Sequence, residues 1–149
     1  MSVKSKIFNE ILDSILSRIE SIEVRIASNK ESRDNNTKSS AGDKHETART
    51  MMQIELENNQ KQLQQNLALK QELSKINLER EYASVNFGSL VITNKGKYFI
   101  SIGIGKVEID GEIVFAISLA SPIGQQLKGK KKGDVITFNG NQIEILDVI

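Results

Sequence analysis

Two carboxylate side chains stand three residues apart near the middle of the chain, in the segment AGDKHETART at residues 41–50. At the start of a helix this spacing puts Asp43 and Glu46 on one face, where their oxygens can act together. Mg²⁺ prefers oxygen ligands and keeps several waters, so one or two carboxylates plus a substrate phosphate are enough to hold it. An exposed carboxylate pair at the end of a long helical arm can reach a site on another molecule, so this pair is the main candidate in the chain for chemistry.

The same spacing also has a structural interpretation. Asp-x-x-Glu at a helix start is a variant of the capping box, in which both side chains accept hydrogen bonds from backbone N–H groups. Taken alone, the local spacing favours capping, and capping and catalysis are compatible roles. Asp43→Asn combined with Glu46→Gln separates them, because the amides still cap but carry no charge.

Composition excludes several classes of site. With 20 basic and 19 acidic residues the net charge is +1, so there is no overall signature of polyanion binding. The absence of cysteine excludes disulfides and thiolate metal sites, and the single histidine, His45, supports neither a His-rich metal site nor a Ser/His/Asp triad. We expect a soluble, cytoplasmic protein without a membrane partner, since no segment approaches ~20 apolar residues. Two Tyr, five Phe and no Trp argue against a large aromatic-lined ligand pocket.

The elements that would position the carboxylate pair are two long helices. From about Val3 to Asn29, apolar residues recur every three or four positions, as in a coiled-coil seam: Phe8, Ile11, Ile15, Ile19, Ile22 and Ile26. Residues 30–41 lose this periodicity and contain loop formers from Asn35 to Ser40, which indicates a mobile connection completed by Gly42.

A second helix is expected from Asp43 or Lys44 to about Tyr82. Its apolar stripe comprises Met52, Leu56, Leu63, Leu67, Leu73 and Ile76, with Ile54 and Leu69 beside it. Asn59 and Gln60 interrupt this stripe. Helices this polar are marginal alone, so the seams must pair. Residues 1–82 are thus predicted to form an antiparallel coiled-coil hairpin, on the order of 50 Å long, with its tip at about residues 34–47.

The remaining residues, 83–149, have the pattern of a small β domain. Strands are expected at residues 85–93, 98–104, 113–119, 135–138 and 142–149, with turns at 94–97, 110–111 and 139–141. Pro122 is suited to the first turn of a short helix that ends at Leu127. The predicted fold class is therefore α+β, with a helical hairpin followed by an antiparallel β domain with one short helix.

Three segments of this second region resemble one family. Residues 87–91 (FGSLV), 117–124 (ISLASPIG) and 127–134 (LKGKKKGD) are similar to the C-terminal domain of the Gre transcription elongation factors, which promote transcript cleavage. The SPxG turn followed by LxGKxxGD is the most specific part. Residues 42–48 are similar to the family's tip motif, GDxxENA, with Asp43 and Glu46 at matching positions.

The resemblance implies an FKBP-like C-terminal domain that docks on bacterial RNA polymerase, and a coiled coil that enters the polymerase's secondary channel. There Asp43 and Glu46 would help to hold a Mg²⁺ ion shared with the polymerase, which then cleaves the 3′ end of backtracked RNA. The isolated protein would be a monomer that is not an enzyme and holds no stable metal or other cofactor. Docking is expected to involve a short segment and one lysine: Ser121, Pro122, Ile123, Gly124 and Lys130.

Other interpretations remain open. The tip carries Lys44, His45 and Thr47, which depart from the family pattern, so a non-cleaving regulator or inhibitor that enters the same channel is the main alternative. An FKBP-like fold alone would also be compatible with prolyl isomerase activity. A coiled-coil adaptor is a further functional class. The basic loop of Lys128, Lys130, Lys131 and Lys132 is suited either to an acidic polymerase surface or nucleic acid, or simply to solvent.

Overall fold

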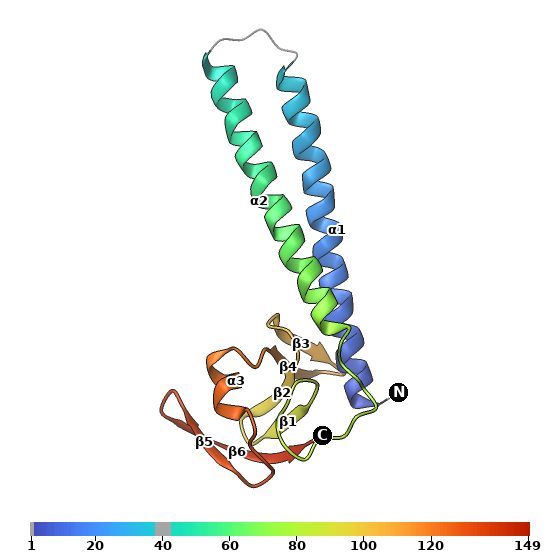
Figure 1. Ribbon diagram of the computed structural model, residues 1–149, viewed down its shortest axis with the longest axis vertical. Helices are drawn as coiled ribbons and strands as arrows, with labels where there is room; N and C mark the ends of the chain where they lie inside the picture. Colours follow the sequence, from blue (N-terminus) through green and yellow to red (C-terminus); the bar gives the residue numbers. More distant parts are fainter. Residues whose placement is uncertain (1, 38–42) are drawn as a thin grey trace. The chain divides into compact units, whose positions relative to one another are not determined.

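The chain is an α+β protein in which two long helices precede a six-stranded mixed sheet and a short helix (Figure 1). The computed structural model describes residues 2–37 and 43–149, except for the side chains of residues 33, 35–37 and 43–45. Of the connection predicted at residues 30–42, residues 38–42 therefore lie outside the described residues.

The first helix, α1, spans Val3–Thr37, eight residues beyond its predicted end. Apolar periodicity does end near Asn29, but the sequence KESRD that follows contains good helix formers and neither Gly nor Pro. The backbone therefore continues as a helix without a seam to bury. The loss of a buried stripe was wrongly taken as the loss of the helix.

The second helix, α2, spans Asp43–Leu73 and ends nine residues before the predicted Tyr82. After Leu73 the chain forms short turns, with the Ile76 amide donating to the Leu73 carbonyl at 3.2 Å. The side-chain oxygen of Asn77 then accepts from the Glu79 amide at 3.0 Å, a local bond that competes with helical hydrogen bonding. Ile76, although it fits the apolar period, is therefore not part of the helix.

The chain divides into two compact units: residues 14–70, and residues 1–13 together with 71–149. The first contains α1 from residue 14 to its end and α2 from its start to residue 70, which lie side by side (Figure 1) and are joined by a 3.3 Å bond from Arg25 Nη2 to Gln62 Oε1. The second contains the sheet, the first turns of α1 and the last turn of α2. This division differs from the compositional boundary at residue 82, because the N-terminal residues group with the sheet.

The sheet has the strand order β3-β4-β2-β1-β6-β5. Its elements in chain order are β1 (Leu90–Thr93), β2 (Gly96–Ile100), β3 (Gly105–Ile109), β4 (Glu112–Ile117), α3 (Pro122–Leu127), β5 (Val135–Phe138) and β6 (Asn141–Val148). Strands β2 and β4 are parallel, with Tyr98 opposite Phe115, and the other neighbours are antiparallel. The prediction of an antiparallel sheet was therefore wrong for the β2–β4 pair, and that of the short helix was correct.

Strand β3 was missed, although its hairpin with β4 has a strong local signal. Asp110 and Gly111 both have positive φ, 52° and 81°, as a two-residue type I′ turn requires. Asn139 and Gly140 repeat this geometry between β5 and β6, with φ of 51° and 78°. The Asp-Gly pair therefore predicts a strand both before and after the turn. In the structure Val107 of β3 and Val114 of β4 are paired across this hairpin.

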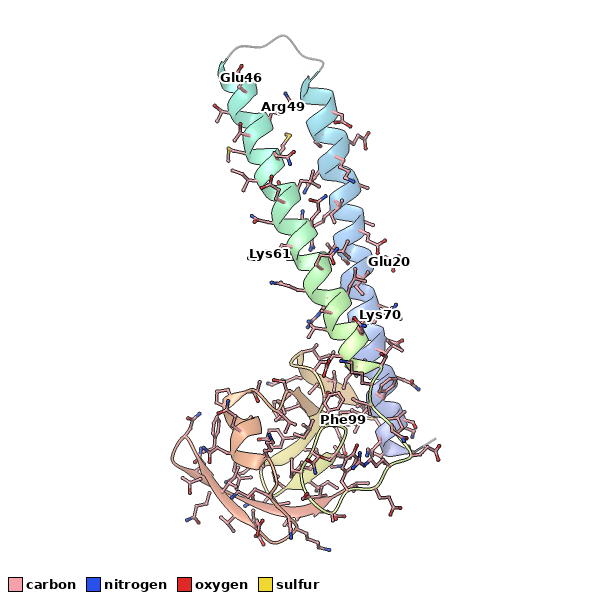
Figure 2. All side chains as sticks on the ribbon, viewed as in Figure 1. Glu20, Glu46, Arg49, Lys61, Lys70 and Phe99 are labelled. Carbon is pink, nitrogen blue, oxygen red and sulfur yellow. The ribbon has the colours of Figure 1, made fainter. Side chains whose placement is uncertain are left out.

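The sheet unit buries apolar residues on both faces of the sheet. One face packs with α3, whose Leu127 joins Ile100, Ile136 and Ile145 in a single core. The alternating positions place Phe99, labelled in Figure 2, on the opposite face, and Phe99 is fully buried. Burial also includes Ile7, Ile11 and Leu73 from the helix ends that belong to this unit.

Candidate functional site

The predicted site lies at the beginning of α2. Asp43 is the first residue of this helix and Glu46 lies in its first turn. The Glu46 side chain is exposed and is labelled in Figure 2. The N-terminal turn of a helix favours acidic residues, and both predicted carboxylates are in this turn. The side chain of Asp43, and with it the distance between the two carboxylates and any capping bond, lies outside the described residues.

The face of α2 that carries Glu46 is mixed in charge. A shallow hollow runs along it, and its described lining residues are Glu46, Arg49, Thr50, Gln53, Ile54 and Glu57. The Thr50 hydroxyl donates to the Glu46 carbonyl at 2.9 Å, so it is turned toward the helix backbone. Arg49 is exposed three residues after Glu46 and lines the same hollow, so this face of α2 also carries a positive charge (Figure 2).

The donor set at this end of α2 is suited to an incomplete metal site. Among the side chains that the structure describes, which do not include Asp43 or His45, no group of three or more His, Cys, Asp or Glu is placed to hold a metal ion. Asp43 and Glu46 supply at most two carboxylates, and Mg²⁺ demands near-octahedral oxygen coordination. These residues therefore fit an ion whose remaining ligands come from water and from another molecule.

The predicted docking segment forms the start of α3. Ser121 is the N-cap: its hydroxyl accepts from the Gly124 amide at 3.1 Å and donates to the Ser118 carbonyl at 2.7 Å. Pro122 occupies the first turn, where a missing N–H costs nothing. Most of the SPxG motif thus has a structural explanation, which leaves the exposed Pro122 and half-buried Ile123 available for contact.

The basic loop that follows α3 is held by backbone bonds. The Gly129 amide donates to the Val85 carbonyl at 2.9 Å and the Val85 amide donates to the Lys130 carbonyl at 2.8 Å. The Asp134 carboxylate accepts from the Lys131 amide at 2.8 Å. These bonds fix the loop while leaving all four lysine side chains exposed: Lys128, Lys130, Lys131 and Lys132.

Sequence reasoning missed a hollow beside α3. It is lined by Tyr98 of β2, Ile123 of α3 and Phe138 of β5, with Lys95, Asn139, Asn141 and Ile143 completing its wall. Burial raises the pKa of Tyr98 above its ordinary 10.0. The protonated hydroxyl can donate or accept a hydrogen bond at neutral pH. Aromatic residues are few, and their total number gave no sign that two of them line one hollow. Two local signals were available. Tyr98 lies two positions before the apolar Ile100 in a strand, so both face the same side of the sheet, and Phe138 directly precedes the Asn-Gly turn.

None of the helices within the described ranges combines the length and the apolar character needed to cross a membrane. Neither a scan of the chain against models of known protein families nor a search of curated proteins gave a match. The function of the chain is therefore inferred from its own residues and their geometry.

Proposed function

We propose that this protein is a Gre-type transcription elongation factor. It binds bacterial RNA polymerase, inserts its paired helices as a coiled coil into the secondary channel, and stimulates the polymerase's own cleavage of backtracked RNA. The sheet and α3 form the FKBP-like part that docks on the polymerase surface. In this proposal Asp43 and Glu46 work only in the assembled complex.

The observation that carries the proposal is the position of Asp43 as the first residue of α2. Because α1 ends at Thr37 and α2 begins at Asp43, both carboxylates belong to the first turn after the chain reverses between two long helices. Helix α2 has 31 residues and is on the order of 45 Å long at ~1.5 Å per residue. A narrow pair of helices of this length is suited to carrying two carboxylates into a deep channel.

The chemistry follows from what two carboxylates can do beside a phosphodiester. When bound, Mg²⁺ lowers the pKa of a coordinated water and stabilises the charge that develops on the phosphate. Asp43 and Glu46 would supply negative oxygens to that ion, while the polymerase and the RNA phosphate supply the rest.

Docking would use the residues of α3 and the basic loop that the fold leaves exposed. Ser121 and Gly124 are needed for the helix start itself, so they would act mainly by positioning the helix. Pro122 and Ile123 would make direct contact, and Lys130 would approach an acidic surface from the loop beside them. The exposed side chains, more than the motif as a whole, are thus the expected points of contact.

The test is RNA cleavage in purified, backtracked elongation complexes with Mg²⁺. Wild-type protein is expected to shorten the RNA from its 3′ end, and Asp43→Asn combined with Glu46→Gln to lose about 100-fold of this stimulation, equivalent to a few kcal/mol of charge stabilisation. Glu57→Gln is the matched control, because it removes an exposed carboxylate from the same hollow of α2. Helical circular dichroism should be the same for all three proteins. Undiminished cleavage by the double variant would leave the pair only a capping role.

A non-cleaving regulator of the same channel is the second candidate, and one observation favours it. Arg49 is exposed one turn after Glu46 and lines the same hollow, so the described tip is less negative than two carboxylates alone would be. The same elongation complexes distinguish the candidates. Loss of RNA synthesis without shortening of the transcript would support the regulator.

A further inference from the structure

Strand β3 forms one edge of the sheet. The strand order β3-β4-β2-β1-β6-β5 gives it a neighbour on one side only, and its five residues pair with β4 alone. The other edge is β5, beside which α3 lies. A further strand could therefore be added outside β3 without covering β5.

The backbone groups of two residues in β3 point away from the sheet. The two-residue turn at 110–111 makes Ile109 the first hydrogen-bonded residue of the β3–β4 hairpin. Hydrogen-bonded positions alternate along an antiparallel strand, so Val107 is also bonded to β4. The N–H and C=O groups of Lys106 and Glu108 therefore lie on the outer edge.

The side chains of the same two residues carry opposite charges. Lys106 and Glu108 are both exposed and, because they are two residues apart on a strand, they lie on one face of the sheet. On β4 they face the uncharged Phe115 and Ile113, respectively. Neither makes an ion pair within the described part of the chain. Both charges are thus available to a strand added outside β3.

This pattern is complementary to itself. If a second copy of β3 lies antiparallel to the first about a twofold axis through Val107, Lys106 faces Glu108 of the second copy, and Glu108 faces its Lys106. The residues that face each other are also those whose backbone groups point outward, so each Lys–Glu pair can exchange both of its backbone hydrogen bonds. Opposite charges at directly facing positions stabilise an antiparallel pair of strands.

The same charges disfavour other registers. An axis through position 106 places two lysines opposite each other, and an axis through position 108 places two glutamates there, and both arrangements are destabilising. With the axis through Val107, Ile109 faces Gly105 of the second copy, where a Cβ would meet nothing within 4 Å. A lysine alone on an edge strand discourages pairing, whereas a lysine followed two positions later by a glutamate selects one partner.

We propose that two copies of this chain pair through antiparallel β3 strands centred on Val107, with reciprocal contacts between Lys106 and Glu108. The contact uses the same surface on both copies, so it closes at a dimer. Because each β3 has only five residues, the contact is small, and we expect a Kd on the order of 100 µM. The monomer that the resemblance implies is then the form present at low concentration. The inference goes beyond the proposed function and does not depend on it.

Sedimentation equilibrium of the full-length chain, at about 10 µM to 1 mM, measures this association. The average mass of the wild type should rise from that of one chain towards that of two. Lys106→Glu and Glu108→Lys each place like charges opposite each other and should raise the Kd about tenfold or more. Lys95→Glu and Glu144→Lys are matched controls, exposed elsewhere on the same sheet, and should stay within about twofold of the wild type.

Exchanging the two charges separates a loss of pairing from a loss of folding. Lys106→Glu combined with Glu108→Lys in one chain restores the reciprocal pattern, so the Kd should return to within about threefold of the wild type. A mixture of the two single variants should form a heterodimer, because each strand then faces charges opposite to its own.

Amide hydrogen exchange locates the contact in the chain. The Lys106 and Glu108 amides point outward, so their exchange should slow as the protein concentration rises. The Thr137 amide is the control, because the same alternation before the turn at 139–140 points it outward from β5, the other edge strand. Its exchange should not depend on concentration.

A wild type that keeps the mass of one chain at about 1 mM would overturn the proposal. A dimer whose Kd is unchanged by the single variants, or is not restored by the charge exchange, would also overturn it, because that dimer would use another surface. RNA cleavage measured at low micromolar concentration concerns the monomer, so the proposed function stands or falls independently of these results.

Discussion

Gly124 is the residue of α3 whose replacement has the most predictable effect. A Cβ at this position would lie 2.1 Å from the Ser118 carbonyl oxygen and 3.0 Å from the Leu119 Cα. Both atoms belong to the backbone, so the contact cannot be relieved by a side-chain rotation. We expect Gly124→Ala to lower the free energy of unfolding by about 1–3 kcal/mol, measured by urea denaturation.

Gly103→Ala is the control for this prediction. A Cβ at Gly103 would meet nothing within 4 Å, and its backbone is not in the left-handed region. Alanine there should leave stability unchanged or raise it slightly, through the unfolded state. Equal stability of the two variants would mean that the loop before α3 can shift to make room.

Lys4 is a buried ammonium, 5% exposed, and it makes stability depend on pH. Its Nζ donates to the Arg80 and Ile149 carbonyls at 3.3 and 3.2 Å and lies 4.8 Å from the centre of the Tyr82 ring. Burial nevertheless lowers the pKa of Lys4 below its ordinary 10.5. Between the lowered pKa of the folded chain and the ordinary pKa of the unfolded chain, the unfolded chain binds more protons than the folded chain. The free energy of unfolding should therefore rise with pH in this range.

Chemical denaturation at a series of pH values up to about 10 measures this slope. Lys4→Met should flatten it, while the exposed Lys106→Met should not. The pH series stops at about 10 because of Tyr98, whose pKa is raised in the folded chain. Above the ordinary tyrosine pKa of 10.0, this shift makes the free energy of unfolding fall as the pH rises. A slope unchanged by Lys4→Met would show that burial does not perturb this group.

At the scale of the elements, the paired helices contain polar residues within their seam. Asn59 is only 6% exposed, and its Nδ2 has no hydrogen-bond partner among the described residues. Asn29 Nδ2 and Asn66 Oδ1 are also buried and have no hydrogen-bond partner among the described residues. An asparagine in such a seam can fix the register of two helices at a cost in stability.

Asn59→Leu is therefore expected to stabilise the helix pair by about 1–3 kcal/mol, because it removes an unsatisfied buried group and adds apolar contact. The measurement is denaturant unfolding followed by the helical signal. The neighbouring Asn58→Leu, at an exposed position, should change stability by no more than about 0.5 kcal/mol. A destabilised Asn59→Leu would indicate that this amide has a partner in solution.

The helices and hairpins were predictable from sequence to the extent that local rules decide them. Seam positions such as Ile15, Ile19 and Ile22 are buried as periodicity predicts. In α2 the predicted stripe was correct in part: Asn59, predicted to interrupt it, is buried, whereas Leu67, predicted to belong to it, is 39% exposed. The spacing of the leucines alone did not show which of them face α1.

At the scale of the whole molecule, the sheet unit is discontinuous in sequence. It combines residues 1–13 with residues 71–149. The N-terminal part contributes fully buried Ile7 and Ile11 and an ion pair between Lys6 and Asp110 at 3.3 Å. A chain that begins at residue 83 would lose these contacts and expose apolar surface.

We therefore expect residues 83–149 alone to unfold at a lower temperature, or to aggregate, compared with a chain in which residues 1–13 are joined to 71–149 by a flexible Gly/Ser linker. Thermal unfolding followed by circular dichroism compares the two. Equal melting temperatures would mean that the N-terminal helix turns add little to the sheet unit.

The candidate site was only partly predictable for a related reason. Asp43 and Glu46 are close in sequence, so their common place in the first turn of α2 follows from spacing alone. The hollow beside α3 brings Lys95, Ile123 and Phe138 together from three elements, and no local pattern encodes that meeting. The parallel pairing of β2 with β4 escaped prediction in the same way, because it depends on a crossover.

The central claim is that the polymerase uses carboxylates from this chain to hold its Mg²⁺, and the rate of RNA cleavage as a function of Mg²⁺ concentration tests it most directly. The wild type should reach its half-maximal rate at a Mg²⁺ concentration about tenfold below that needed with Asp43→Asn combined with Glu46→Gln, while Glu57→Gln should follow the wild type. Superimposable Mg²⁺ curves for the wild type and the double amide variant would contradict the claim.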